Sequence, residues 1–182
     1  MITFQQNQIK EISQKIINGE IIALPTDTIY GLTCKFDDDN AINEIYQIKN
    51  RNYKKVLPIL VGSWEEAKTV GIISDELKSF LSSNFNAGKV TVIVLKQPTL
   101  NTKYWINKKT VAIRVSNSHF IQKLTKLTGP LIATSCNLSN NEPITNYHDI
   151  NLPNLKYKVA GEILENKPSI IFDSLNSKII RQ

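Results

Sequence analysis

The sequence has little that could bind a metal ion or hold the chain in a membrane. Its 182 residues include two cysteines, Cys34 and Cys136, and two histidines, His119 and His148. These residues are too few and too far apart for a zinc site, and unpaired thiols are typical of reducing compartments. No apolar run approaches the ~20 residues of a membrane span, and the polar N-terminus lacks the pattern of a signal peptide. We therefore expect a cytoplasmic protein that does not contact a membrane.

The composition is that of a globular protein with an excess of positive charge. Hydrophobic residues make up 41% of the chain and charged residues 21%, which are ordinary values for a soluble domain. The length favours one domain, residues 1–182, with a sizeable core. Lysine and arginine number 22 against 16 aspartate and glutamate residues, which gives a formal charge of +6. Such a charge favours anionic partners such as nucleotides or RNA.

Apolar segments with the periods of strands and of helices alternate along the chain. Strands are predicted at 21–24, 56–61, 90–95, 110–115 and 130–134, with a closing hairpin at 168–173 and 178–181. Helices are predicted at 7–18, directly after the turn at 37–40, at 64–70, at 75–83 and at 118–127. This interleaving indicates an α/β domain with a mixed, twisted sheet.

Two features between these elements have structural interpretations. The run Asp37-Asp38-Asp39 could suggest a metal site, but three consecutive carboxylates cannot all converge on one ion. It is therefore predicted to be the start of a helix, where aspartate caps backbone amides and complements the helix dipole. Residues 97–109 are predicted to form a loop that Trp105 anchors.

Polar and charged side chains stand near the ends of the predicted strands, in positions that a core would not favour. They come from four places in the chain, namely Thr26 with Thr28, Lys49 with Arg51, Arg114, and Ser135 with Asn137. Ligands of open α/β sheets gather in the crevice at the strand ends. A single site built from these groups would suit a polyanion such as a nucleoside triphosphate, together with a small carboxylate.

Each of these groups also has a purely structural interpretation. Residues 26–28 could form a tight turn with local hydroxyl–backbone hydrogen bonds. Lys49 and Arg51 could complement the dipole at a helix C-terminus, and Arg114 could lie on a solvent-facing side of its strand. Ser135 and Asn137 are common turn residues. The residues alone leave these alternatives open.

Taken in order, five motifs resemble those of the YrdC-like threonylcarbamoyl-AMP synthases. They are residues 25–32 (Pro-Thr-Asp-Thr-Ile-Tyr-Gly-Leu), Lys49-Asn50-Arg51, residues 111–115 with the later His119, residues 134–139 (Thr-Ser-Cys-Asn-Leu-Ser), and residues 168–173 with 180–181. The resemblance covers nearly the whole chain and fits the short, single-domain form of the family. It implies a YrdC-like three-layer domain, in which helices flank a twisted sheet of parallel and antiparallel strands.

The resemblance implies a nucleotidyltransferase that makes threonylcarbamoyl-AMP and pyrophosphate from ATP, L-threonine and bicarbonate or carbon dioxide. The product serves the threonylcarbamoyladenosine modification of tRNA. A downstream threonylcarbamoyl-transferase complex is therefore an expected partner, and tRNA is a candidate contact. Mg²⁺ would accompany ATP and bridge its phosphates, without direct protein ligands. This chemistry needs alignment and stabilisation of phosphate charge rather than a protein nucleophile.

The resemblance also implies roles for individual residues. The expected catalytic residues, which would also bind the phosphates of ATP, are Lys49, Arg51, Ser135 and Asn137. Arg114 would bind the carboxylate of threonine, for which a guanidinium group is suited, and Thr26 and Thr28 would line the threonine pocket. Further ATP contacts are expected at Lys55, Thr110, Ser169 and Arg181.

Some positions depart from the usual pattern of the family. Leu60 replaces a histidine that touches threonine in some members, and Asn140-Asn141 stands where a glycine is usual. The Lys-x-Arg and Ser-x-Asn groups are intact, so an active enzyme is predicted. Two alternatives are a non-catalytic protein that binds tRNA or double-stranded RNA, which the positive charge would suit, and a carbamoyl-adenylate-forming domain with another acceptor.

Overall fold

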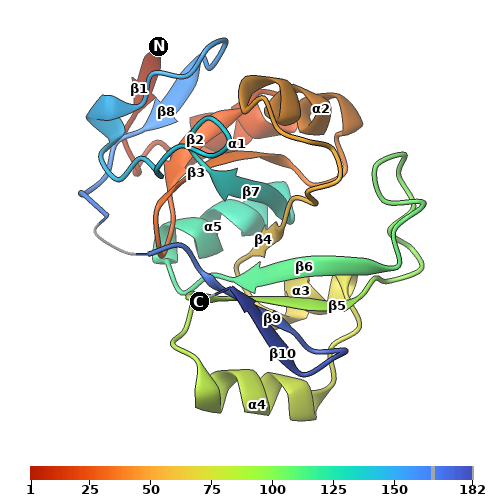
Figure 1. The fold of residues 1–182 in the computed structure, drawn as a ribbon. Coiled ribbons are helices and arrows are strands. Elements are labelled where there is room, and N and C mark those ends of the chain that lie inside the picture. The colour runs from red at the N-terminus through yellow and green to blue at the C-terminus, as the bar shows by residue number, and fades with distance from the viewer. Residues whose placement is uncertain (165–166, 182) are drawn as a thin grey trace.

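One mixed sheet runs through the part of the chain that the structure describes. The structure is a computed structural model that describes residues 1–164 and 167–181. Within these residues, ten strands lie in the order β1-β8-β2-β3-β7-β4-β6-β5-β9-β10 (Figure 1). The strands are β1 (Ile2–Phe4), β2 (Ile22–Pro25), β3 (Tyr30–Lys35), β4 (Ile59–Val61), β5 (Val90–Leu95), β6 (Thr110–Val115), β7 (Leu131–Ser135), β8 (Tyr157–Val159), β9 (Ile170–Asp173) and β10 (Lys178–Arg181). Parallel pairs such as β4–β6 stand beside antiparallel pairs such as β5–β6, so the predicted mixed sheet is confirmed.

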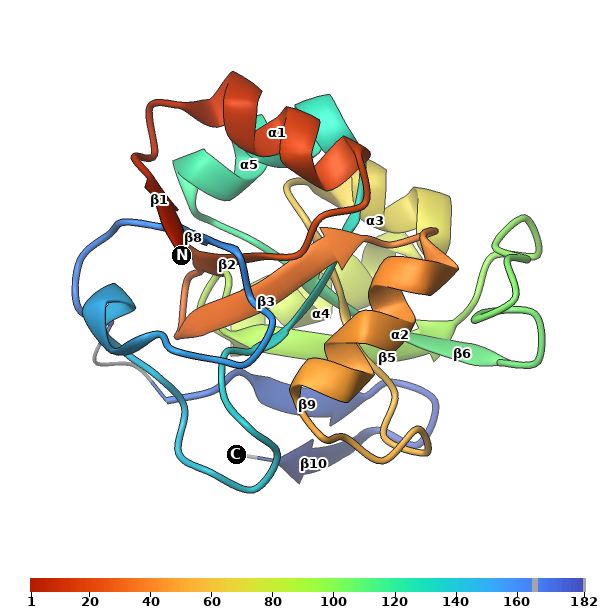
Figure 2. The ribbon, with the colours of Figure 1, turned by 90° about the horizontal axis from the view of Figure 1, so that it is seen from above.

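Helices cover both faces of this sheet. They are α1 (Ile9–Ile17), α2 (Asp39–Ile48), α3 (Trp64–Val70), α4 (Asp75–Asn84) and α5 (His119–Thr128), and Tyr147–Asp149 form a 3₁₀ turn. α1 and α5 pack side by side on one face (Figure 2) and share an apolar core with alternate residues of β2, β4 and β7. The other residues of these strands face a second core, to which α2, α3 and α4 contribute. These three layers confirm the predicted architecture. Within the described residues, no helix is long and apolar enough to cross a membrane.

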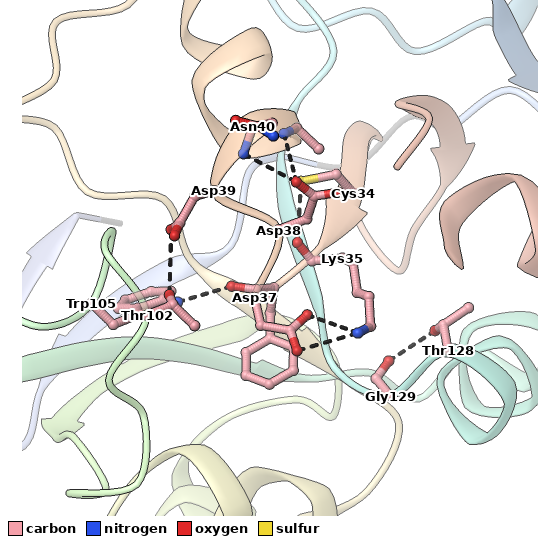
Figure 3. Close-up of polar contacts among 12 residues, drawn as sticks. Cys34, Lys35, Asp37, Asp38, Asp39, Asn40, Thr102, Trp105, Thr128 and Gly129 are labelled. Carbon is pink, nitrogen blue, oxygen red and sulfur yellow. Dashed lines mark hydrogen bonds and ion pairs between the residues drawn. The ribbon is translucent and has the colours of Figure 1, made fainter. Parts of the chain in front are cut away.

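The acidic run before α2 is the start of a helix, as predicted (Figure 3). The carboxylate of Asp38 is the N-cap and accepts hydrogen bonds from the amides of Asn40 and Ala41, both at 3.0 Å. Asp39 accepts a hydrogen bond from the amide of Tyr104 at 2.8 Å and so holds the 97–109 loop. Trp105 is fully buried in that loop, and its indole N–H donates to the carbonyl oxygen of Phe36 at 2.9 Å (Figure 3). The predicted anchoring by Trp105 is confirmed.

The strand predictions need corrections at three strands, which are β4, β1 and β8. The strand expected at 56–61 begins only at Ile59, because Val56 is exposed and the amide of Leu57 donates to the hydroxyl of Tyr104 instead of to a strand. β1 and β8 were not predicted. They are parallel neighbours of three residues each, too short to show an alternating pattern. The closing hairpin is confirmed, since β9 and β10 pair in antiparallel fashion.

The helical cover on the α1–α5 face ends near the middle of the sheet. Leu60 of β4 belongs to the core under α1 and α5, and it pairs in register with Arg114 of β6. Beyond that pair, Ala112 of β6 and Thr91 and Ile93 of β5 line a cavity on the sheet. Strands β5 and β6 therefore form one wall, the floor, of a cavity next to the face that α1 and α5 cover.

Candidate functional site

The cavity on this floor has a volume of about 370 Å³ and is walled by segments that are distant in sequence. Its walls come from the turn between β2 and β3, the segment before β4, the end of β7, and the β9–β10 hairpin. Seven of the predicted site residues line it, namely Thr26, Thr28, Arg51, Arg114, Ser135, Ser169 and Arg181. The structure thus brings together the groups that the sequence placed at separate strand ends.

A second cavity, of about 330 Å³, lies on the opposite face of strands β5 and β6. Its walls include Val92 and Ile113, whose neighbours Thr91 and Arg114 face the first cavity. No arginine or lysine is among its described lining residues. The first cavity, with its three arginines, is therefore the candidate site.

Arg114 and Thr28 line the site and are bound to each other. The Arg114 side chain is buried, at 9% exposure, and its Nη1 donates a hydrogen bond to Oγ1 of Thr28 at 2.7 Å. The Thr26 hydroxyl donates to the carbonyl oxygen of Ile29 at 2.7 Å and lies 3.3 Å from the Thr28 hydroxyl. The solvent-facing alternative for Arg114 is therefore wrong. The turn interpretation of residues 26–28 is confirmed. Both threonines also line the cavity, and their role in binding threonine stays a prediction.

Asp27 fixes this turn from behind. Its carboxylate accepts hydrogen bonds from the hydroxyl of Ser116 at 2.6 Å and from the amide of Asn117 at 2.7 Å. Both residues follow β6, the strand that carries Arg114. Asp27 therefore ties the turn that carries Thr28 to the strand that carries Arg114.

Arg51 and Arg181 line the same cavity. Arg51 Nε donates to the carbonyl oxygen of Lys55 at 3.1 Å, so the chain after α2 curls around its guanidinium group. Arg181 Nη2 donates to the carbonyl oxygen of Ser169 at 2.6 Å, across the β9–β10 hairpin. The Ser169 hydroxyl in turn lies 2.8 Å from that of Thr91.

The three arginines influence one another electrostatically. Burial lowers the pKa of Arg114; the charge of Asp27 opposes this shift and that of Arg181 adds to it. Burial also lowers the pKa of Arg181, and the charge of Arg51 adds to that shift. No Asp or Glu is among the described residues that line the cavity. Three mutually repelling cations in such a cavity favour an anionic ligand.

Lys49 is placed differently from Arg51, although only one residue separates them. It is the C-cap of α2, is 1% exposed, and does not line the cavity. Its ammonium group donates to the carbonyl oxygen of Ser135, to that of Asn137 at 2.7 Å, and to Oδ1 of Asn137 at 2.8 Å. Burial, and next the charge of Arg51, lower the pKa of Lys49 to about 8.

The family model for Sua5, YciO and YrdC proteins, described as "Telomere recombination", matches residues 14–182. The chain belongs to the Sua5/YciO/YrdC family. A threonylcarbamoyl-AMP synthase of Blochmanniella floridana is 32% identical, over 96% of this chain and 95% of its own. A threonylcarbamoyl-AMP synthase of Yersinia enterocolitica is 30% identical, with the same coverage. The crystal structure of P. abyssi Sua5 complexed with L-threonine matches with a TM-score of 0.82 at 24% identity, over 96% of this chain and 55% of that longer chain. The predicted family is thus confirmed, and the likeness to Sua5 shows the fold.

Not every family motif residue lines the cavity of this Sua5/YciO/YrdC member. Lys55 is exposed on the loop after α2, and Thr110 lies at the start of β6, beyond the cavity wall. Asn137 lies behind Ser135, whose hydroxyl donates to Oδ1 of Asn137 at 2.7 Å. The ligand-binding roles of the predicted residues, whether or not they line the cavity, stay predictions.

Thr91 lines the cavity but was not predicted as a site residue. It is 3% exposed and shares a hydrogen bond with Ser169. The signal in the sequence was a single hydroxyl in the otherwise apolar strand 90–95. Leu60, which replaces the histidine of some family members, lines the cavity with its apolar side chain.

Proposed function

We propose that this chain is an L-threonylcarbamoyladenylate synthase, which forms threonylcarbamoyl-AMP and pyrophosphate from ATP, L-threonine and bicarbonate or carbon dioxide. The observation that carries the proposal is the convergence of Arg51, Arg114 and Arg181 on one cavity whose described lining contains no carboxylate. Such a site suits two anionic substrates at once. Relatives at 30–32% identity over almost the whole chain are named threonylcarbamoyl-AMP synthases, which supports the proposal.

Arg114 is the group for the carboxylate of L-threonine. One of its N–H groups is used on Thr28, at 2.7 Å, and the planar guanidinium has further donors that can pair with both oxygens of a carboxylate. Thr26 and Thr28 add hydroxyls to the same cavity, while Leu60 and Ala133 add apolar surface. A small, hydroxylated amino acid fits this mixture of contacts.

The triphosphate of ATP is assigned to the other two arginines of the cavity. Arg51 and Arg181 supply positive charge, and Ser135 and Ser169 supply hydroxyls. Arginine binds phosphate oxygens in the same forked manner as it binds carboxylates. The α-phosphate of ATP would then lie between Arg114 and the other two arginines, within reach of the amino group of the bound threonine.

The reaction follows from this placement. The amine of threonine adds to carbon dioxide and gives a carbamate, with release of one proton. When bicarbonate is the source, its dehydration to carbon dioxide consumes one proton and forms one water, so no net proton is released. A carbamate oxygen attacks the α-phosphorus of ATP, the bond from phosphorus to the α–β bridging oxygen breaks, and pyrophosphate leaves with that oxygen. The described lining of the cavity contains no histidine, cysteine, lysine or carboxylate. The protein would therefore act by aligning the reactants and stabilising negative charge.

Mg²⁺ is proposed to enter with ATP. Among the described residues, no group of three or more His, Cys, Asp or Glu could hold a metal ion, whereas the cavity offers hydroxyls near the proposed phosphate site. This donor set fits an ion that takes most of its ligands from phosphates and water. When bound, Mg²⁺ would neutralise part of the phosphate charge. The proposal also includes a cytoplasmic location and transfer of the product to tRNA by a separate threonylcarbamoyl-transferase complex.

The test is pyrophosphate release from ATP and Mg²⁺, with threonine and bicarbonate omitted in turn. We expect release only when both are present. Release that ignores either compound would contradict the proposal, and release supported by carbamoyl phosphate without threonine would point to the carbamoyl-adenylate alternative. No release at all, together with salt-dependent tRNA binding, would point to the RNA-binding alternative.

A further inference from the structure

Lys49 has the motif position of a phosphate ligand but not the geometry of one. Its side chain leaves the C-terminus of α2 and is 1% exposed, among the largest fully buried side chains of the described residues. Arg51, only two positions later, lines the substrate cavity, and Lys49 does not. The Lys-x-Arg motif therefore sends its two cations to different environments.

The ammonium group of Lys49 already has three oxygen partners. An ammonium group has three N–H donors and no acceptor. The partners are the carbonyl oxygen of Ser135, the carbonyl oxygen of Asn137 at 2.7 Å, and Oδ1 of Asn137 at 2.8 Å. A direct bond to a phosphate would require Lys49 to give up at least one of these buried oxygens.

The same lysine holds the loop after β7 at several points. Its backbone carbonyl oxygen accepts a hydrogen bond from the amide of Ser139 at 2.8 Å. Oδ1 of Asn137, which Lys49 binds, also accepts the hydroxyl of Ser135 at 2.7 Å. Nδ2 of Asn137 donates to the carbonyl oxygen of Asn141, farther along the loop. The loop that begins with the Ser-x-Asn segment is thus bound both by the ammonium group and by the backbone carbonyl of Lys49, and Ser135 at its start lines the cavity.

We propose that Lys49 is a positioning residue of the synthase. Its hydrogen bonds hold the Ser135–Asn141 loop in place, and its side chain contacts no phosphate of ATP. This inference rests on the proposed function for its kinetic consequences, although the structural role itself can be tested without any substrate. The buried positive charge still acts on the anionic substrate through the loop. Its effect on ATP is therefore indirect, through the place of Ser135 and through the electrostatic field.

The first experiment compares amide hydrogen exchange of the ligand-free wild-type chain with that of Lys49→Met. The variant keeps an unbranched side chain, one heavy atom shorter than that of lysine, but removes all three donors. We expect exchange at the amides of residues 136, 137, 139 and 141 to rise ~10-fold or more, since loss of one buried charged hydrogen bond already changes an equilibrium by about that factor. Lys54→Met, which removes an exposed lysine from the neighbouring loop, is the matched control and should leave these amides unchanged.

The kinetic counterpart is a fall in kcat. A displacement of ~1 Å in a catalytic group can cost about 100-fold in rate, and we expect a loss of that order in Lys49→Met. Unchanged exchange of the ligand-free loop, combined with weaker ATP binding, would overturn the proposal and make Lys49 a phosphate ligand. Faster loop exchange in a protein that makes no threonylcarbamoyl-AMP would refute the proposed function and leave the positioning role standing.

A second experiment needs no variant and covers the case in which Lys49→Met does not fold. It is a crystal structure of the wild-type chain with Mg²⁺ and a non-hydrolysable ATP analogue. We expect the Lys49 nitrogen to remain within hydrogen-bond distance of the Ser135 and Asn137 oxygens. A nitrogen that has moved to a phosphate oxygen would overturn the proposal.

Discussion

Replacing Arg114 by lysine should damage threonine binding selectively. The change keeps a positive charge but removes the planar fork that can pair with both carboxylate oxygens. The site offers little compensation, because Arg114 is buried and its known partner is the hydroxyl of Thr28 at 2.7 Å. A lysine at this position can reach a carboxylate with a point charge only, so at least one charged hydrogen bond is lost.

The size of the effect follows from that lost bond. Hydrogen bonds to charged groups contribute about 1.5–3 kcal/mol, which corresponds to ~10- to 150-fold in an equilibrium constant. We therefore expect the KM for L-threonine of Arg114→Lys to rise by ~10- to 150-fold, while the KM for ATP stays close to that of the wild type. The assay should be run near pH 7, since burial lowers the pKa of a lysine and a higher pH would remove its charge.

The matched control is an arginine-to-lysine substitution at Arg181. Arg181 also lines the cavity and donates to the carbonyl oxygen of Ser169 at 2.6 Å. Arg181→Lys should raise the KM for ATP more than that for threonine, the reverse of the pattern for Arg114→Lys. Equal increases for both substrates in Arg114→Lys would refute the assignment of Arg114 to the threonine carboxylate.

Three further predictions concern the frame of the site. Because burial lowers the pKa of Lys49 to about 8, activity should fall as pH rises through 8, where the folded protein loses this proton. The free energy of unfolding should gain a rising contribution from Lys49 between pH 8 and 10.5, because only the unfolded chain keeps the proton there and the cost of burying the charge is removed. The two trends are measured by pH–rate profiles and denaturant titrations, and a flat pH–rate profile up to pH 10 would contradict the first. Gly88→Ala should raise the KM for threonine, because a Cβ at Gly88 (φ +76°) would come within 2.3 Å of Oδ1 of Asp27. The control is Gly129→Ala, because Gly129 has the same φ but open space around its Cβ position. Equal effects of the two variants on the KM would show that the contact with Asp27 is not the cause. Trp105→Ala should lower the free energy of unfolding by about 3–5 kcal/mol, and a loss below ~1 kcal/mol in a urea titration would show that Trp105 does not anchor its loop.

Most of the fold could be predicted because its strands are strongly apolar. The runs at 90–95 and 110–115 became β5 and β6 with the predicted bounds. The short outer strands β1 and β8 could not be found, because three residues do not establish an alternating pattern and their pairing is non-local. Val56 was wrongly placed in a strand because its apolar side chain gave no sign that it would be exposed.

The site was predictable as a set of residues but not in its orientation. Polar residues at strand ends indicated which segments meet, and Thr28 and Arg114 do meet although 86 positions separate them. The sequence could not reveal that Lys49 turns into the protein and Arg51 into the cavity, since that depends on the last turn of α2. Nor could it separate Thr110, at the edge of β6, from Thr91, which faces the cavity.

The proposed synthase joins threonine, carbon dioxide and AMP into one molecule. The direct measurement is mass spectrometry of the nucleotide products formed from ATP, ¹³C-labelled bicarbonate and L-threonine. We expect a nucleotide that contains threonine, AMP and one ¹³C atom, formed in equal amount with pyrophosphate. Pyrophosphate released together with free AMP, with no labelled carbon in any nucleotide at the earliest times, would contradict this expectation.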